Sequence, residues 1–330
     1  MGLPERFIAV EEHSLFPVMK AALAGLGSRE FPEPLDARLL DVGDGRLTAM
    51  DDLGIDVQVL SLCPPGAQVP DAEQAVKLAS RLNDDMAAAI ERHPTRFLGF
   101  ATLPIGDPVA AARELERCVD HLGFKGAMIH GRCGGEFLDF PEFDPILRAA
   151  ADLEVPLFLH PAPPNEVIQA TYYRNLHAPP DLAPALEERL MTAAWGWHVE
   201  SGLHVLRMIL SGVFDRYPGL QVILGHWGEL LPFFIARFDQ MTRSAATHLR
   251  LPPGDYLAEN CYIAPSGLET IPPLLLCLSV VGADRIIYAV DYPFTPDTIG
   301  RKFIDDAPIS AEDKRKIAHL NAEQLLRIDP

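Results

Sequence analysis

Short apolar runs alternate along this chain with longer segments in which apolar residues recur at helical spacing. The apolar runs are bounded by turn residues and predict eight strands. They span residues 7–12, 55–62, 97–102, 126–130, 155–160, 220–225, 258–263 and 286–290. The helical spacing predicts helices over residues 71–92, 108–122, 143–153, 200–216, 229–247, 266–280 and 310–327. Strands and helices therefore alternate from one end of the chain to the other.

This alternation predicts an α/β fold with a parallel sheet. Strands that are separated by helices pair in parallel through right-handed crossovers, and eight is the strand number of the (β/α)8 TIM barrel. The 330 residues exceed a minimal barrel by an amount that two insertions would absorb, one at 14–40 after strand one and one at 161–199 after strand five. No shift in composition marks a domain boundary, so we expect one barrel domain over residues 1–330.

Composition narrows the classes of partner. A hydrophobic content of 48% with 22% charged residues is typical of a folded globular protein. The net charge of -18 argues against a nucleic-acid partner, which needs clustered Lys and Arg. No basic leader precedes an apolar stretch, and no apolar run approaches the roughly 20 residues of a membrane helix. We therefore expect no membrane partner and a cytoplasmic location. The five cysteines have no metal-like spacing and are interpreted as reduced thiols.

Polar side chains end three of the predicted strands. Glu11 and His13 end the first strand, His160 the fifth and Asp291 the eighth. A parallel barrel gathers the carboxyl ends of its strands at one mouth, and strand alternation places Glu11 and His13 on the same face. Two imidazoles and two carboxylates suit one divalent ion of intermediate hardness. We therefore predict a metal site with these four ligands, with Mn²⁺ preferred and Zn²⁺ next.

A fifth imidazole follows the sixth predicted strand. His226 and Glu229 are separated by Trp227-Gly228 where that strand turns into a helix, so the carboxylate could orient the imidazole or share its proton. The alternative is a carboxylate that interacts with a helix dipole near a structural histidine. For the motif Trp195-Gly196-Trp197-His198, packing is favoured over a role as the aromatic walls of a pocket.

Two arginines interrupt largely apolar neighbourhoods. Arg46 precedes Leu47-Thr48-Ala49-Met50, and Arg237 lies within Phe234-Ile235-Ala236-Arg237-Phe238. Either could hold a substrate carboxylate. The competing interpretation is that both are surface residues in weak ion pairs, as most arginines are.

Taken in order, these motifs resemble the metal-dependent decarboxylases of the amidohydrolase superfamily, a branch that includes γ-resorcylate, 2,3-dihydroxybenzoate and 5-carboxyvanillate decarboxylases. The similarity covers nearly the whole chain. Its most specific pieces are Val10-Glu11-Glu12-His13, Arg46-Leu47-Thr48-Ala49-Met50-Asp51-Asp52-Leu53-Gly54-Ile55-Asp56, Gly123-Phe124-Lys125-Gly126, Leu159-His160-Pro161, Gly212-Val213-Phe214-Asp215-Arg216-Tyr217-Pro218, Leu224-Gly225-His226-Trp227-Gly228-Glu229 and Tyr288-Ala289-Val290-Asp291-Tyr292-Pro293.

The resemblance implies an activity and a set of roles. The implied reaction is the nonoxidative loss of CO₂ from a hydroxybenzoate-like acid, with Asp291 protonating the ring carbon. The implied metal ligands are Glu11, His13, His160 and Asp291. The resemblance also implies that His226 and Glu229 form a proton relay, that Arg46 and Arg237 lie near the substrate, with Arg237 reaching a neighbouring subunit's site, and that the chain forms a homodimer or homotetramer.

Two other functions use the same residues. A hydrolase or hydratase would use the metal to activate water, with Asp291 as a general base. A barrel without catalysis would only bind its ligand, which the intact set of four ligands argues against. The residue pattern at the strand ends fits both enzymes, and the detailed resemblance favours the decarboxylase.

Overall fold

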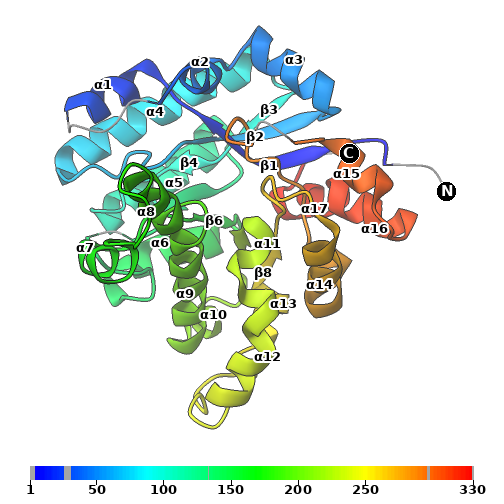
Figure 1. Ribbon diagram of the computed structural model, residues 1–330. Helices are drawn as coiled ribbons and strands as arrows, with labels where there is room; N and C mark the ends of the chain where they lie inside the picture. Colours follow the sequence, from blue (N-terminus) through cyan, green and yellow to red (C-terminus); the bar gives the residue numbers. More distant parts are fainter. Residues whose placement is uncertain (1–3, 26–30, 133, 296–297, 329–330) are drawn as a thin grey trace.

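The computed structural model describes residues 4–25, 31–132, 134–295 and 298–328, in which parallel strands are surrounded by helices (Figure 1). Cys133 lies outside these residues. The strands are β1 (Ile8–Ser14), β2 (Val57–Leu62), β3 (Phe97–Gly99), β4 (Ala101–Thr102), β5 (Ala127–His130), β6 (Leu157–His160), β7 (Val222–Leu224) and β8 (Cys261–Ile263). The helices of the first half are α1 (Pro17–Gly25), α2 (Leu35–Leu40), α3 (Asp44–Leu53), α4 (Ala72–Arg92), α5 (Pro108–Leu122) and α6 (Asp144–Asp152). Those of the second half are α7 (Glu166–Ile168), α8 (Ala183–Met191), α9 (Gly196–Leu210), α10 (Val213–Arg216), α11 (His226–Glu229), α12 (Leu231–Thr242), α13 (Asp255–Asn260), α14 (Ile271–Val281), α15 (Arg301–Asp306), α16 (Ala311–Arg315) and α17 (Asn321–Leu326).

All strand pairs are parallel, in the orders β1-β2-β3 and β4-β5-β6-β7-β8. The predicted strand 97–102 is interrupted at Phe100, which gives β3 and β4. The predicted strand 286–290 is not a regular strand, but its backbone lies between β8 and β1. The Ile287 N–H donates to the Ile263 carbonyl, and the Val10 N–H donates to the Tyr288 carbonyl, both over 3.0 Å. The eight predicted strand positions therefore follow one another in the order of a TIM barrel.

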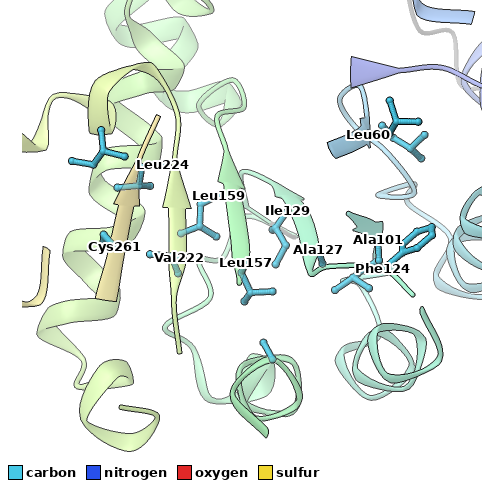
Figure 2. Packing of buried hydrophobic residues seen from close by; sticks show 14 of the residues in the cluster. Leu60, Ala101, Phe124, Ala127, Ile129, Leu157, Leu159, Val222, Leu224 and Cys261 are labelled. Carbon is cyan, nitrogen blue, oxygen red and sulfur yellow. The ribbon is translucent and has the colours of Figure 1, made fainter. Parts of the chain in front are cut away.

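The buried side chains show which face of each strand points into the barrel. One buried cluster takes alternate residues from all eight strand positions and from α17. Its members are Ile8, Val10, Val57, Val59, Phe100, Met128, Phe158, Ile223, Tyr262, Ala264, Ile287, Ala289, Ala322 and Leu326. The other face of the strands, with Ile129, Leu157, Leu159 and Val222, packs in a second cluster that includes buried residues of the helices (Figure 2). Because eight strands contribute to one interior, this interior is the core of the barrel.

Strand β1 contains an irregularity that decides where its polar end points. Ala9 pairs with Gln58 but Glu12 pairs with Leu60, so β1 carries one residue more than β2 over this stretch. Ile8 and Val10 face the barrel interior, and strict alternation would turn Glu11 and His13 toward the helices. The extra residue is a β-bulge, and it returns both side chains to the interior.

The predicted helices 71–92 and 108–122 are confirmed as α4 and α5. Asp107 caps α5 by accepting from the Ala110 N–H, and Gly123 ends it in the left-handed region at φ 72°. The predicted helix 200–216 is divided, because Gly212 at φ 72° separates α9 from α10. The two insertions contain helices that the sequence pattern did not predict, among them α1, α2, α7 and α8. In the part of the chain that the structure describes, no helix is long and apolar enough to cross a membrane.

Candidate metal centre

A layer of polar side chains covers one end of the barrel core. The inward-facing residue at the carboxyl end is polar at six strand positions besides β1, whereas the residues below it are mainly apolar. These residues are Ser61, Thr102, His130, His160, Ser266 and Asp291. Together with Glu11 and His13 they form the floor of the barrel mouth, which is where TIM barrels place their active sites.

The four predicted ligands converge in this layer. His13 Nε2 lies 3.2 Å from Asp291 Oδ1 and 3.8 Å from Glu11 Oε1. His160 Nε2 lies 3.5 Å from the same Glu11 oxygen. Two ligands that are each about 2.1 Å from one ion stand about 3.0 to 3.4 Å apart at octahedral or tetrahedral angles. The observed separations therefore match a shared divalent ion after shifts of a few tenths of an ångström.

Two buried atoms in this cluster have no hydrogen-bond partner: Glu11 Oε1 and His13 Nε2. Their companion atoms have contacts, since the Ser266 hydroxyl donates to Glu11 Oε2 and His13 Nδ1 lies 3.4 Å from the Leu62 carbonyl. In the third predicted ligand, His160, Nδ1 lies 2.7 Å from the Pro161 carbonyl. That bond keeps the proton of His160 on Nδ1 and leaves the lone pair of Nε2 for a ligand. Because buried polar atoms are rarely left unpaired, the free atoms fit a cation at their centre.

The electrostatics agree with this interpretation. Burial alone would lower the pKa of His13, but the Asp291 and Glu11 carboxylates outweigh it and raise the pKa to about 9. Burial lowers the pKa of His160 well below its ordinary value, and repulsion from His13 adds to this effect. Burial also raises the pKa of Asp291, with a further contribution from Glu11. Negative charge is thus in excess around His13, while His160 is held in the neutral form that metals require.

His226 and Glu229 lie beside this cluster. His226 Nδ1 is 2.9 Å from Glu229 Oε1, and its Nε2 is 4.0 Å from Asp291 Oδ2. Burial would lower the pKa of His226, but Glu229, Glu11 and Asp291 raise it to about 10. Glu229 Oε2 lies 2.7 Å from Nδ1 of a second histidine, His198, at the start of α9. The Glu229 carboxylate is therefore shared by two imidazoles.

The turn that carries His226 is strained. α11 is not a right-handed helix, because His226, Trp227, Glu229 and Leu230 have φ values of 47°, 58°, 52° and 68°. Such conformations cost non-glycine residues roughly 1–3 kcal/mol each. The turn is held by the bond from the Trp227 N–H to the Ala264 carbonyl (2.8 Å). Helix α9 approaches it at Gly202, where a Cβ atom would come within 2.5 Å of the Glu229 carbonyl oxygen.

Arg46 lies on the opposite side of the β1 backbone from the cluster and is fully buried. Its Nε donates to the Asp41 carbonyl (2.9 Å), and its terminal nitrogens donate to the Gln58 side chain (3.4 Å) and the His13 carbonyl. Its guanidinium also lies 4.7 Å from the centre of the Tyr292 ring. In this structure Arg46 therefore supports the backbone of a predicted ligand.

Glu12 belongs to the same buried support. Its two oxygens accept from the Val290 N–H (2.9 Å) and the Gln58 side chain (2.8 Å). Glu12 thereby ties β1 to β2 and to the residue before Asp291.

The structure does not bring Arg237 to the cluster. It lies on the exposed face of α12, where it donates to the Gln240 side chain (3.1 Å).

The sequence did not assign three residues to the site, and for the motif that contains His198 it favoured packing. Ser266 fixes one oxygen of Glu11, His198 shares Glu229, and His130 packs against His160 with ring centres 5.1 Å apart. His130 ends a predicted strand in the same way as His160, so the signal used for His160 could have found it. Ser266 follows β8 in an irregular segment at φ 46°, and nothing in the local sequence marks that geometry.

Comparison with known proteins links this geometry to a family. The chain matches the amidohydrolase family model over residues 33–328. It is 36% identical over 337 residues to the γ-resorcylate decarboxylase of Rhizobium radiobacter, covering 98% of both chains. It is also similar to the solved dihydroxybenzoic acid decarboxylase of a Polaromonas species, which holds manganese and the inhibitor 2-nitroresorcinol. That structure has a TM-score of 0.86 and 34% identity, with 98% of each chain covered. The 5-carboxyvanillate decarboxylase of Novosphingobium aromaticivorans, complexed with manganese and 4-hydroxy-3-methoxy-5-nitrobenzoic acid, has a TM-score of 0.86 and 33% identity over 98% of this chain and 96% of that one.

Proposed function

This chain belongs to the amidohydrolase family, and from that premise we propose that it is a manganese-dependent, nonoxidative decarboxylase of an ortho-hydroxy aromatic carboxylic acid. The two solved relatives described above hold manganese, and their bound ligands are nitrophenols. In those molecules a nitro group stands next to a phenolic oxygen, as a carboxylate would in an ortho-hydroxybenzoate.

The observation that carries the proposal is the pair of unpartnered buried atoms, Glu11 Oε1 and His13 Nε2. We assign them, with His160 Nε2 and Asp291, as the ligands of one divalent ion. Manganese is preferred and zinc is the second choice for this mixture of nitrogen and oxygen donors. When bound, the ion supplies positive charge for the carboxylate and the ortho oxygen of an anionic substrate.

Asp291 is our candidate for the proton donor. In the metal-free site burial and Glu11 raise the pKa of its carboxyl, and a bound cation would lower it again, so the donor role requires a proton delivered to Asp291 at short range. Transfer of that proton to the ring carbon that bears the carboxylate forms a C–H bond. The C–C bond then breaks, its electrons return to the ring and CO₂ leaves. His226 Nε2, 4.0 Å from Asp291 Oδ2, is the nearest imidazole outside the proposed ligands that can return a proton to Asp291.

Arg237 belongs in this proposal as a residue of a second subunit. It projects from α12 beside two exposed aromatic side chains, Phe233 at 73% and Phe234 at 58% of full exposure. Exposed aromatic residues next to an arginine are typical of protein interfaces. A homodimer or homotetramer that covers α12 would bury the two rings and place Arg237 against a neighbouring chain, where it can hold the substrate carboxylate.

The experiment is a direct measurement of CO₂. Purified protein with Mn²⁺ is supplied with 2,6-dihydroxybenzoate, 2,3-dihydroxybenzoate, 5-carboxyvanillate and salicylate, and both CO₂ and the decarboxylated phenol are quantified. We expect stoichiometric formation of both products from at least one acid. The control is Asp291→Asn with its metal content measured. Release of CO₂ at most of the normal rate by that variant, or no CO₂ from any of the acids, would contradict the proposal.

A further inference from the structure

The Trp195-Gly196-Trp197-His198 motif begins α9, and its last two side chains lie next to the proposed relay. The His198 and His226 rings are 4.5 Å apart, and the Trp197 ring is 6.2 Å from His160. Trp197 and His198 are partly buried, whereas Trp195 is 47% exposed. The motif therefore has an inner half against the site and an outer half at the surface.

The hydrogen bonds of His198 determine where its protons lie. The Trp197 indole N–H can only donate, and it lies 3.0 Å from His198 Nε2. This donor needs a lone pair on Nε2, so neutral His198 carries its proton on Nδ1. That N–H points at Glu229 Oε2, 2.7 Å away. When His198 is protonated, its Nε2–H has a second partner in the Ala193 carbonyl at 2.9 Å, and Nδ1 still donates to Glu229.

Glu229 links His198 to His226, the imidazole that faces Asp291. One of its oxygens is occupied by His198, which leaves Oε1 to accept from His226 Nδ1 at 2.9 Å. The Glu229 side chain is fully buried, so no water replaces either partner. The Nδ1 atom of His226 therefore keeps its proton in both protonation states. Only Nε2, which faces Asp291, can gain or lose one.

We propose that Trp197 and His198 are positioning residues that act through Glu229 to confine the exchangeable proton of His226 to Nε2. The effect on catalysis rests on the proposed function, because decarboxylation consumes one proton per turnover. The carboxylate leaves as CO₂, and the ring carbon keeps the proton from Asp291. If His226 carried its exchangeable proton on Nδ1, that proton would face Glu229 and could not restore Asp291.

Three substitutions separate the hydrogen bonds from packing. His198→Leu removes both ring nitrogens, His198→Asn restores a donor near the position of Nδ1, and Trp197→Phe removes the indole N–H while retaining an aromatic ring. Trp195→Phe is the matched control, because it changes the same residue type in the outer half of the motif. We expect kcat to fall about 10- to 100-fold in His198→Leu, with KM and manganese content unchanged. His198→Asn should recover most of this loss, Trp197→Phe should show a smaller decrease, and Trp195→Phe should match the unsubstituted protein.

The second readout does not depend on activity. In ¹⁵N-histidine-labelled protein loaded with diamagnetic Zn²⁺ and titrated to the pH at which His226 is neutral, the imidazole nitrogen shifts report the tautomer of His226. We expect the Nδ1-protonated form in the unsubstituted protein and a mixture of tautomers in His198→Leu. An unchanged His226 tautomer in His198→Leu, equal losses in Trp195→Phe and Trp197→Phe, or a loss of bound metal in the His198 variants would overturn the proposal. Failure of the proposed function is distinguishable, since it would abolish CO₂ release in the unsubstituted protein and leave the tautomer measurement intact.

Discussion

Two clusters of histidine and carboxylate lie side by side at the barrel mouth, and each has the composition of a metal site. Glu11, His13 and His160 form one, and His198, His226 and Glu229 form the other. In the first, Glu11 Oε1 and His13 Nε2 are buried without a hydrogen-bond partner. In the second, Glu229 has an imidazole on each oxygen at 2.7 and 2.9 Å.

The difference shows that residue types alone do not identify a metal site. A buried carboxylate whose oxygens are both engaged by imidazoles gains nothing from a cation that would displace those bonds. A buried oxygen without a partner is destabilising until something positive approaches it. We therefore interpret the first cluster as a metal centre. We interpret the second as a hydrogen-bonded group in which Glu229 determines which nitrogen of each imidazole carries a proton.

Replacement of Glu11 gives the largest expected effect. Glu11→Gln removes a proposed ligand and one of the two carboxylate charges, so bound manganese should be lost and CO₂ release should fall by more than about 10³-fold. Glu229→Gln in the second cluster should lower CO₂ release but keep the manganese. Metal analysis of both variants after gel filtration checks this. Equal metal loss in the two would remove the distinction between the clusters.

Metal removal should destabilise the protein through the first cluster only. At a free Mn²⁺ concentration of 100 times the dissociation constant, binding to the folded state adds about 2.7 kcal/mol to the free energy of unfolding. Chelation should therefore lower the unfolding midpoint of the unsubstituted protein and of Glu229→Gln. It should leave Glu11→Gln unchanged, as measured by denaturant titration with and without chelator. A chelator-sensitive Glu11→Gln would place the ion elsewhere.

Ser266 tests how far the first cluster depends on the residues around it. Ser266→Ala removes the hydroxyl that donates to Glu11 Oε2 and leaves that buried oxygen free to turn. We expect manganese affinity to weaken about 10- to 100-fold, as is usual when a partner of a metal ligand is removed. Competition with a fluorescent chelator measures this. Ser61→Ala is the control at the same mouth, because the Ser61 hydroxyl contacts His13 Nδ1 only at 3.4 Å.

His204 gives the pH dependence expected of a hydrogen-bonded imidazole outside both clusters. His204 is buried, and its Nε2 accepts from the Leu138 N–H at 2.9 Å. Burial lowers its pKa to about 3, and Arg207 and Arg132 contribute. Because the folded pKa lies below the unfolded value of 6.5, this stability is fully present above that pH and is lost as the pH falls toward 3.

Between pH 7.5 and 5.5, His204 should therefore reduce the free energy of unfolding by about 1.4 kcal/mol. His204→Gln keeps an acceptor near Nε2 and cannot titrate. Between pH 7.5 and 5.5 its free energy of unfolding should therefore fall by about 1.4 kcal/mol less than that of the unsubstituted protein. Chemical denaturation of metal-free protein at both pH values is the measurement. The same slope in both proteins would assign the pH dependence to other groups.

The strand positions and their polar ends could be predicted because they depend on local patterns. Apolar runs mark strands wherever the core buries them, and His160 and Asp291 stand out as the polar residues that follow such runs. The helices of the insertions could not be predicted, since α8 leaves Leu186 and Leu190 exposed and lacks a clear buried face.

The partners of the predicted residues were harder to foresee. Ser266 meets Glu11 across 255 positions in the chain, and His198 meets Glu229 across 31. Such pairs depend on how the barrel closes and on a run of left-handed residues at His226–Leu230 that no local rule predicts. Arg46 stands out in the sequence as a charge among apolar residues, but whether it faces the substrate or supports a ligand depends on which side of β1 it lies.

The bulge in β1 has a consequence for how this centre could arise or be transplanted. If the same residues formed a regular strand with Ile8 and Val10 still facing the core, the strand end would keep all of its metal-binding chemistry, yet Glu11 and His13 would face the helices. A protein engineer who copied the whole segment Ile8–His13 onto a regular strand of another barrel, with Ile8 and Val10 facing inward, would obtain a Glu11 and a His13 that face the helices. Counting residues along β1 therefore matters as much to this centre as choosing them.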